Sequence, residues 1–439
     1  MKESKRVANV GLSVGSVAAR IASRHIFGLE KKNEKNAEDL ANALGNLKGP
    51  LMKVAQLLST IPDILPQEYV EKLSTLQANA PSMGWLFVKR RMSAELGPNW
   101  KNKFSYFNKE SNYAASLGQV HHAKNLDGKP LACKLQYPDM QSVVKADLKQ
   151  LKIILALYGK YDNVIDTDEI YEELSNRLSE EIDYLRESKH MLLYNNILKN
   201  INGVNIPKPI SELSSSQLLT MSWLEGKKMS EFYDKDQKIR DNIANNLFTA
   251  WYLPFYKYGV IHGDPHPGNY TVAENGSILN LLDFGCIRIF PPHFVNAVID
   301  LYKAMRDNDQ ELAIYAYKSW GFNDLSKKMI ETLNMWANYV YAPLLVDKKR
   351  YIQEERGSKY GREIAGKVYK ELRKLGGVKP PKEFVLVDRA AIGLGSVFMH
   401  LRAKLNWHRM CEEMIENFSK INLEKCQSEE LRKCKIKKN

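Results

Sequence analysis

The chain has 439 residues, of which 44% are hydrophobic and 10% aromatic. This composition excludes general disorder, and the length exceeds what one simple core covers, so two or three packed units are expected. Lys and Arg (64) outnumber Asp and Glu (51), which gives a formal net charge of +13. The excess indicates anionic partners such as nucleotide phosphates or lipid headgroups, although a basic solvated surface explains most of it equally well.

Cysteine usage and the N-terminus bear on location. None of the five cysteines forms a C-x-x-C pair, which disfavours a disulfide framework or a zinc site and fits a reducing compartment. The basic N-terminus is similar to a weak signal peptide, but small residues and Arg20 interrupt its apolar stretch, so an amphipathic helix or a frayed end is expected.

The stretch 384–403 contains Asp388, Arg389 and Arg402 and is predicted to be a buried helix, not a membrane span.

Hydrophobic spacing predicts a change of structure near residue 104. Before it, apolar residues recur at steps of three and four, which predicts helices over 35–60 and about 67–96. After it, short apolar or alternating runs predict strands over 104–107, 117–123, 130–137, 208–213 and 217–223. Helices are predicted over 139–160 and 168–199. Beyond Gly226 the chain should be mainly helical, with short strands at 270–272 and 278–282.

This order predicts an α+β fold. Its expected parts are a helical extension (1–103), a sheet-rich lobe (104–225), a helical lobe (226–423) and a basic, disordered tail (424–439) that could touch anionic membrane. A sheet-rich lobe followed by a helical lobe is typical of a kinase, which binds nucleotide between its lobes. The pattern alone does not decide for a kinase, so the motifs carry the argument.

The first motif runs from His262 to Asn269 with the sequence HGDPHPGN. Asp264 and Asn269 have the spacing of a kinase catalytic loop, H-x-D-x-x-x-x-N. A carboxylate at Asp264 can orient an attacking hydroxyl and accept its proton, and the amide oxygen of Asn269 can bind Mg²⁺. The alternative is a polar turn without a role, which two prolines and two glycines between apolar runs disfavour.

The second motif is Asp283-Phe284-Gly285, and Asp283 follows Asn269 by fourteen residues. A hard carboxylate at a strand end is what a Mg²⁺ ion that bridges two phosphates requires. The tripeptide alone is weak support. Its distance from the first motif makes it strong, because the two motifs then flank one short hairpin.

The third motif is Leu-Ala-Cys-Lys at 131–134, which matches in type the kinase strand whose lysine holds the nucleotide phosphates. A strand lysine usually just faces solvent, but an upstream segment, 113–121, lies where a phosphate loop should be. Its alanines limit close backbone approach. The predicted nucleotide contacts are Ala114, Ala115, Ser116, Gly118, Gln119 and Lys134, together with Met221 and Trp223 of an interlobe hinge.

These motifs resemble those of the UbiB/ADCK (AarF-type) atypical kinase-like family over roughly residues 40–420. The family hallmark AAASxGQVHxA matches 113–123, with Tyr113 in place of the first alanine. Its E-x-D motif matches Glu181 and Asp183. Its K-x-G-Q helix matches Lys53 to Gln56, with Ala55 in place of glycine.

The resemblance implies a two-lobed atypical protein-kinase-like fold with an N-terminal helical extension. In the family the K-x-G-Q helix covers the site where a protein substrate would dock, so Lys53 and Gln56 are implied to contact the E-x-D carboxylates and the pocket. Glu181 and Asp183 are expected on one helix, where one could pair with Lys134 or Lys53 and the other reach a metal. Which of Glu181, Asp183 and Glu187 pairs with Lys134 stays open, and a solvated acidic face is the alternative for all of them.

The resemblance also implies ATP or ADP and Mg²⁺ as cofactors and an ATPase or a small-molecule or lipid kinase linked to ubiquinone biosynthesis. No A-P-E segment follows Gly285, so protein substrates are not expected. The alternatives are a small-molecule phosphotransferase of the aminoglycoside or choline kinase type and a nucleotide-switched lipid-binding scaffold. Gly393 and Gly395 form a lone G-x-G that suggests helix packing more than phosphate binding.

The expected partners are nucleotide, anionic lipid and enzymes of ubiquinone biosynthesis, and a homodimer is allowed. Nucleic acid is not expected, because no basic motif with interleaved aromatic residues is present. The expected location is the cytoplasm or the inner face of a membrane, or the mitochondrial matrix in a eukaryote.

Overall fold

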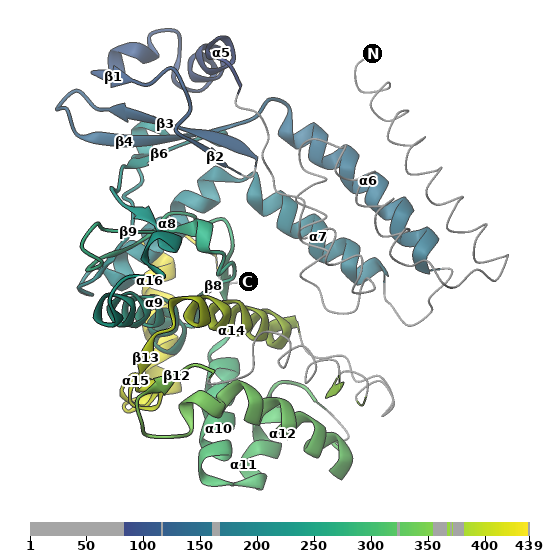
Figure 1. Ribbon diagram of the computed structural model, residues 1–439. Helices are drawn as coiled ribbons and strands as arrows, with labels where there is room; N and C mark the ends of the chain where they lie inside the picture. Colours follow the sequence, from purple (N-terminus) through teal and green to yellow (C-terminus); the bar gives the residue numbers. More distant parts are fainter. Residues whose placement is uncertain are drawn as a thin grey trace, which may run out of the picture. The chain divides into compact units, whose positions relative to one another are not determined.

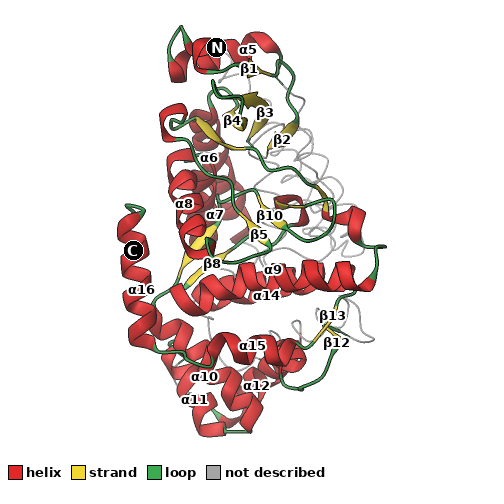
Figure 2. Ribbon diagram, turned by 90° about the vertical axis from the view of Figure 1, so that its left-hand side faces the viewer, coloured by secondary structure: helices red, strands yellow, loops and turns green. Residues whose placement is uncertain are grey.

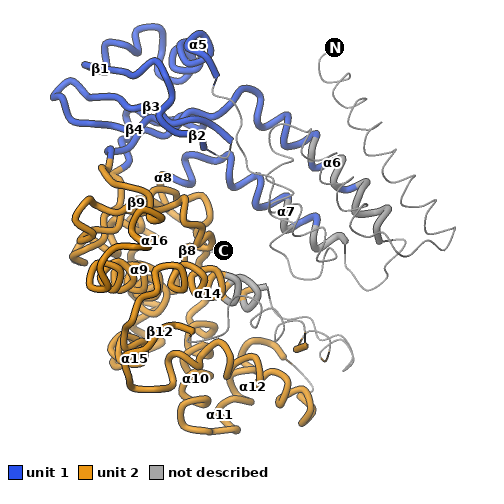
Figure 3. Tube along the Cα trace, viewed as in Figure 1, with its two compact units in different colours: residues 1–187, 209–223 blue, residues 188–208, 224–439 orange. Residues whose placement is uncertain are grey.

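The computed structural model describes residues 83–115, 117–159, 167–322, 325–353, 367–368, 371 and 382–437. The helix predicted over 35–60, with Lys53 and Gln56, lies outside the described residues. The chain divides into two compact units (Figure 3). Unit 1 comprises Met1–Glu187 with Pro209–Trp223, and unit 2 comprises Ser188–Lys208 with Leu224–Asn439. Each is described below by itself.

Unit 1 holds a five-stranded antiparallel sheet (Figure 1). Its strands are β1 (Tyr106–Phe107), β2 (Tyr113–Ala115), β3 (Gly118–Lys124), β4 (Pro130–Gln136) and β6 (Leu218–Ser222). The spatial order is β1-β3-β4-β6, and β2 also pairs with β3. The turn between β3 and β4 uses Gly128 at φ +78°, where a side chain would be strained. Residues 131–136 are buried at every position, so both faces of β4 are covered.

The strand predicted over 208–213 is wrong apart from an isolated bridge between Pro209 and Met221. The chain there forms a 3-10 helix, η2 (Ser211–Leu213). The Thr220 hydroxyl donates to the carbonyl of Leu213 (2.6 Å), and the Ser214 hydroxyl donates to that of Ile210 (2.8 Å). Hydroxyl groups that bond to nearby backbone compete with a sheet ladder.

Helix α5 (Trp85–Leu96) and the 3-10 helix η1 (Trp100–Lys103) belong to the core of unit 1. Trp100 lies within 5.1 Å of Phe107 and 6.1 Å of Trp85, both centroid to centroid. Val88 and Met92 are fully buried against the sheet residues of the same cluster. Residues 85–103, which were predicted to belong to the helical extension, therefore pack on the sheet as part of unit 1.

Three helices follow β4 and carry the acidic motif: α6 (Met140–Gly159), α7 (Thr167–Glu181) and α8 (Tyr184–Leu198). The single helix expected over 168–199 is broken at residues 182–183, because Asp183 accepts the backbone N–H of Arg186 (2.9 Å) and so begins α8. Glu181 and Asp183 thus do not share one helix, contrary to the prediction.

Unit 2 is built around α9 (Gln237–Tyr258), which ends at Gly259 in the left-handed conformation. The other described helices of unit 2 are most of α8, together with α10 (Pro292–Asp307), α11 (Gln310–Ser319), α12 (Lys327–Tyr341), α14 (Lys382–Leu401), α15 (Trp407–Ile415) and α16 (Lys420–Lys433). Figure 2 shows α14 running beside α9, with which it is in contact. The short 3-10 helices are η3 (Met229–Phe232), η4 (Pro267–Asn269) and η5 (Ala342–Leu344).

The strands of unit 2 form small sheets. One sheet has the order β5 (Val204–Asn205), β10 (Leu279–Leu281), β9 (Tyr270–Val272) and β7 (Lys227–Lys228). The others pair β8 (Val260–His262) with β11 (Ile287–Ile289), and β12 (Arg350–Tyr351) with β13 (Lys404–Leu405). The strands predicted near 270–272 and 278–282 are confirmed as β9 and β10. Strand β10 pairs with β9 antiparallel and with β5 parallel.

Most of the stretch 384–403, expected to be a buried helix, lies in α14, which ends at Leu401 and has Leu394, Val397 and Leu401 buried. Among the described residues, no helix is both long and apolar enough to cross a membrane.

The predicted disordered tail is wrong across its described part. Residues 420–433 form α16, with Leu423, Gln427 and Leu431 buried at steps of four. The Gln427 amide donates to the carbonyls of Tyr258 (2.9 Å) and Phe290 (2.8 Å). A glutamine in the middle of the buried stripe interrupts the apolar pattern, which is why the sequence looks like a basic tail.

We predict that Leu431→Ala lowers the free energy of unfolding by about 2–5 kcal/mol, because it leaves a cavity under α16. Lys425→Ala, on the exposed face of the same helix, should change it little. Thermal unfolding of both variants measures the difference. Equal midpoints would show that α16 is not packed.

Candidate active site

His262 joins the two motif loops of unit 2. It is the last residue of β8 and is fully buried. Its Nε2–H donates to the carbonyl of Asp283 (2.6 Å), and its Nδ1 accepts the backbone N–H of Asp264 (3.2 Å). Both candidate aspartates are therefore held through their backbones by one imidazole ring.

The hydrogen bonds also fix the charge of His262. One ring nitrogen donates and the other accepts, which is the pattern of a neutral imidazole. Burial lowers the pKa of His262, and the nearby Asp264 and Asp283 carboxylates only partly oppose this. The ring acts as a positioning group, since it exposes neither nitrogen to a reactant.

Packing around His262 excludes water. The Trp251 indole N–H donates to the His262 carbonyl (3.0 Å), and the two ring centroids lie 4.9 Å apart. Phe284 is fully buried, and its ring centroid lies 6.0 Å from that of His262 and 5.3 Å from that of Tyr194. Aromatic side chains from α8, α9 and the Asp283 loop thus enclose the ring.

Asn269 is tied to Asp264. Its Nδ2 donates to both the backbone carbonyl and the Oδ2 of Asp264, at 3.1 Å each. The short helix η4 that carries it is capped by His266, whose Nδ1 accepts the N–H of Gly268 (3.0 Å). With its nitrogen used in this way, the amide oxygen of Asn269 is the atom that suits a hard cation.

Asp283 follows β10 and lies beside the same loop. The N–H of Leu282 donates to the carbonyl of Asn269 (3.0 Å), and the Oδ1 of Asp283 accepts the N–H of Gly285 (3.0 Å). Asp264, Asn269 and Asp283 are all half-buried. Three residues predicted from spacing therefore come together in unit 2.

The donor set fits Mg²⁺ only with help from a ligand. Within the described ranges, no group of three or more His, Cys, Asp and Glu side chains could hold a metal by itself. Asp283 offers a carboxylate and Asn269 an amide oxygen. Mg²⁺ commonly binds one or two carboxylates and takes its remaining ligands from phosphates and water.

In unit 1, Lys134 forms a buried ion pair with Glu187. The Nζ of Lys134 lies 2.8 and 2.9 Å from the two carboxylate oxygens of Glu187. Lys134 is 8% exposed and Glu187 2% exposed. The ring of Tyr184, one turn before Glu187 on α8, lies 5.2 Å from the ammonium. Lys134 is thus held inside unit 1. Of the three acidic residues considered as its partner, Glu181, Asp183 and Glu187, the structure shows an ion pair with Glu187.

The segment predicted to hold phosphates is a tight hairpin, with Ala115 opposite Gly118; Ser116 lies outside the described residues. A Cβ on Gly118 would lie 2.3 Å from the carbonyl oxygen of Leu135 and 2.9 Å from the hydroxyl of Tyr184. The glycine is needed so that the hairpin can pack on β4 and α8.

Gln119 has a structural role that the sequence did not indicate. Its fully buried amide accepts the N–H of Met83 (2.7 Å) and donates to the Met83 carbonyl (3.2 Å). It also bonds to Nε2 of His121 (2.7 Å), and burial lowers the pKa of that histidine. These bonds occupy the Gln119 side chain, so its predicted contact with nucleotide finds no support in this geometry.

The residues of the predicted hinge differ in exposure. Met221 is buried in β6, whereas Trp223 is half-buried and donates its backbone N–H to the carbonyl of Pro130 (3.1 Å). Its ring stacks on Tyr113, with centroids 5.9 Å apart. The tyrosine that replaces the first hallmark alanine therefore has a packing partner.

A family model described as the ABC1 atypical kinase-like domain matches residues 75–316. The chain belongs to this family. The match includes every described candidate residue, from Ala114 to Asp283, and confirms the relationship that the motifs indicated.

Individual ABC1-family relatives agree. The protein "ACTIVITY OF BC1 COMPLEX KINASE 8, chloroplastic" from Arabidopsis thaliana is 32% identical over 282 residues, which is 62% of this chain and 37% of that protein. The mitochondrial atypical kinase COQ8 from Saccharomyces cerevisiae is 27% identical over 315 residues, which is 69% of this chain and 63% of that protein. The chain thus spans less than two thirds of the length of either protein.

A solved structure also matches over most of the chain. The complex of Rv3197 with erythromycin from Mycobacterium tuberculosis is 25% identical, with a TM-score of 0.61, and the match covers 87% of this chain and 96% of that one. With the family match, this confirms the α+β, kinase-like fold class of this ABC1-family chain.

We predict that Glu187→Gln lowers the free energy of unfolding by about 3–5 kcal/mol, because it removes the Glu187 counter-charge from the buried Lys134 ammonium. The same substitution at the exposed Glu172 should have almost no effect. Thermal and denaturant unfolding measure both. A Glu187→Gln variant as stable as Glu172→Gln would contradict a buried pair.

We also predict that stability falls as the pH drops below 6.5, the ordinary pKa of histidine. The pKa of His262 is lower in the fold than in the unfolded chain, so the unfolded state takes up the proton first and stability is lost as pH decreases. In His262→Gln, the unfolding midpoint should fall less between pH 7.5 and 5.5 than in the unmodified chain. In His293→Gln, at an exposed site, it should fall equally. Equal falls in all three proteins would remove His262 as the cause.

Proposed function

We propose that this protein is an ATP-binding, Mg²⁺-dependent atypical kinase or ATPase that supports ubiquinone biosynthesis and does not phosphorylate proteins. The observation that carries the proposal is the pair of motif loops joined by His262, which brings Asp264, Asn269 and Asp283 together. In kinases, residues of these types at these spacings orient the acceptor and hold the metal.

Each residue then has one role. Asp264 orients a water or an acceptor hydroxyl and takes its proton. Asn269 and Asp283 bind Mg²⁺, which would neutralise charge on the phosphates. Lys134 would hold phosphates and is kept in place by Glu187, as the lysine–glutamate pair of active kinases is.

The segment after Asp283 supports the exclusion of protein substrates. Strand β11 pairs with β8 directly after the motif, with Ile287 opposite His262. Helix α10 begins at Pro292, soon after this strand. The chain between the metal motif and α10 is thus used within the fold of unit 2, which leaves little for a peptide platform.

The link to ubiquinone rests on the family resemblance and on relatives such as the yeast atypical kinase COQ8. The proposal includes a peripheral position on anionic lipid at an inner membrane face. The net charge of +13 and the exposed Lys425, Arg432 and Lys433 of α16 support it. Enzymes of ubiquinone biosynthesis and a second copy of the chain remain proposed partners.

We predict that Asp283→Asn abolishes the stabilisation that MgADP gives to the folded protein, because the variant loses the carboxylate that binds the metal. A ligand at a hundredfold excess over its Kd stabilises by about 2.7 kcal/mol. Thermal unfolding with and without MgADP measures this, and Asp127→Asn, in an exposed turn, is the control. Unchanged stabilisation in Asp283→Asn would remove Asp283 from the site.

Turnover separates this proposal from its alternatives. ATP hydrolysis should require Asp264 and rise with anionic lipid vesicles or a quinone-precursor phenol. A soluble hydroxyl compound that becomes phosphorylated would favour a small-molecule phosphotransferase. Hydrolysis no faster than in Asp264→Asn would favour a nucleotide-switched scaffold.

A further inference from the structure

Unit 2 contains a partly open apolar cavity of about 510 Å³. Its walls come from α9, α10, α12, η5 and α14. Aromatic side chains dominate the lining, including Trp251, Tyr252, Phe255, Phe294, Trp336 and Phe398. Well-packed interiors keep few voids larger than a water molecule, whereas small-molecule sites commonly measure about 300–1,000 Å³. The size and the walls are those of a ligand site.

The lining restricts the chemistry of the ligand. No residue of the described lining carries a charge, which argues against nucleotides, phosphates and other ions. Its polar side chains are tyrosine hydroxyls, Ser396 and Gln353, together with the indole N–H groups of its tryptophans. The Nε2 of Gln353 donates to the Tyr339 hydroxyl (2.8 Å), while its buried Oε1 accepts no hydrogen bond from the part of the chain that the structure describes. A buried acceptor without a donor is costly, and a ligand O–H or N–H would satisfy it.

Two walls of the cavity also contact the catalytic loop. Trp251 lines the cavity and donates to the carbonyl of His262. On α14, Gly393 lines the cavity and also lies against the loop, since a Cβ at this position would be 2.4 Å from Cγ of Pro265. Pro265 directly follows Asp264. A change in the position of α14 or of Trp251 would therefore change the position of Asp264.

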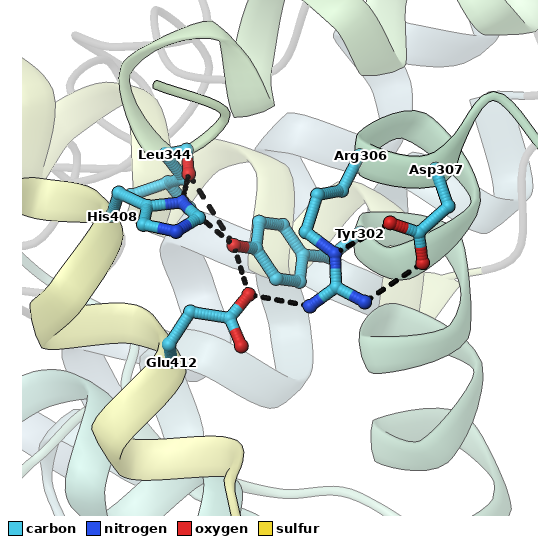
Figure 4. A network of polar contacts seen from close by, with 6 residues as sticks. All are labelled: Tyr302, Arg306, Asp307, Leu344, His408 and Glu412. Carbon is cyan, nitrogen blue, oxygen red and sulfur yellow. Dashed lines mark hydrogen bonds and ion pairs between the residues drawn. The ribbon is translucent and has the colours of Figure 1, made fainter. Parts of the chain in front are cut away.

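The η5 wall is held by a polar network (Figure 4). Glu412 Oε1 accepts from the Tyr302 hydroxyl and from Arg306, both at 2.7 Å. His408 contacts the carbonyl of Leu344 through Nδ1 (2.7 Å), and Leu344 lines the cavity. Burial opposes ionisation of Glu412, but these two hydrogen bonds outweigh it and lower its pKa. Because this wall is fixed, adjustment to a ligand would fall on α14 and Trp251.

We propose that this cavity binds a neutral, largely apolar small molecule with one hydroxyl or amide donor, and that its occupancy adjusts the catalytic loop through α14 and Trp251. The ligand donates to Oε1 of Gln353, and its body lies among the aromatic rings. The effect on the catalytic loop rests on the proposed function, whereas the binding itself does not.

Gly395 gives a direct test of binding. It lines the cavity, and a Cβ there would meet no heavy atom within 4 Å. Gly395→Leu should therefore place its side chain in the cavity, where its Cβ has room, and gain helix propensity. The probes are 1-naphthol and 1-methylnaphthalene, which have similar size but differ in the hydroxyl.

In the full chain, 1-naphthol should raise the unfolding midpoint. Gly395→Leu should leave the midpoint of the unliganded protein at or above that of the unmodified chain, because it adds helix propensity, and should weaken 1-naphthol binding at least tenfold, with Gly395→Ala in between. Gln353→Leu should weaken 1-naphthol about tenfold and leave 1-methylnaphthalene unchanged. Equal 1-naphthol affinity in the unmodified chain and Gly395→Leu would overturn the site, and equal loss of both probes in Gln353→Leu would overturn the role of Gln353.

The coupling is tested by MgADP affinity with and without 1-naphthol. The two ligands should change each other's affinity by the same factor, and Gly395→Leu should abolish the effect of 1-naphthol. Binding of 1-naphthol with unchanged MgADP affinity would overturn the coupling. A protein that binds 1-naphthol but not MgADP would overturn the proposed nucleotide function and leave the cavity site standing.

Discussion

The hydrogen bonds of His262 to Asp264 and Asp283 require an imidazole ring that is neutral and shielded from water. Protonation would place a hydrogen on Nδ1, where the N–H of Asp264 already points. Burial provides the neutral state, and burial here comes from Trp251, Phe284 and Tyr194. The positions of Asp264, the candidate catalytic residue, and of Asp283, the candidate metal ligand, thus depend on aromatic packing that has no chemical role of its own.

In unit 1 the constraint concerns Lys134, whose ammonium group must stay charged although it is buried. Glu187 supplies the counter-charge, and Tyr184 lies within 5.2 Å of the Lys134 ammonium. The same Tyr184, together with the closer carbonyl oxygen of Leu135, leaves no room for a Cβ at position 118. The hairpin and the lysine therefore depend on one tyrosine, which links the alanine-containing loop to the ion pair by packing.

The motifs that carry Asp264, Asn269 and Asp283 could be predicted from the sequence, because their chemistry depends on short, fixed spacing. Asp264, Asn269 and Asp283 lie on loops beside one short hairpin, so spacing predicts their meeting. The partner of Lys134 was not readable, because Glu187 lies 53 positions away and the helix break at Asp183 decides which carboxylate turns toward it. Gln119 and Gln427 were missed for a related reason. Both are polar side chains whose buried hydrogen bonds are made with distant backbone, and no spacing rule reveals such bonds.

The cavity could not be predicted, since its lining is drawn from residues 248–399 and each apolar stretch alone is indistinguishable from ordinary core. Its position makes it more than an imperfection of packing. Trp251 lines the cavity and also donates to the carbonyl of His262, and α14 lies against Pro265 at Gly393, where a Cβ would clash. Under the coupling proposed above, filling the cavity and positioning the loop of Asp264 shift together, because Trp251 contacts both. A molecule that favours one arrangement of Trp251 and α14 would then also favour one arrangement of Asp264.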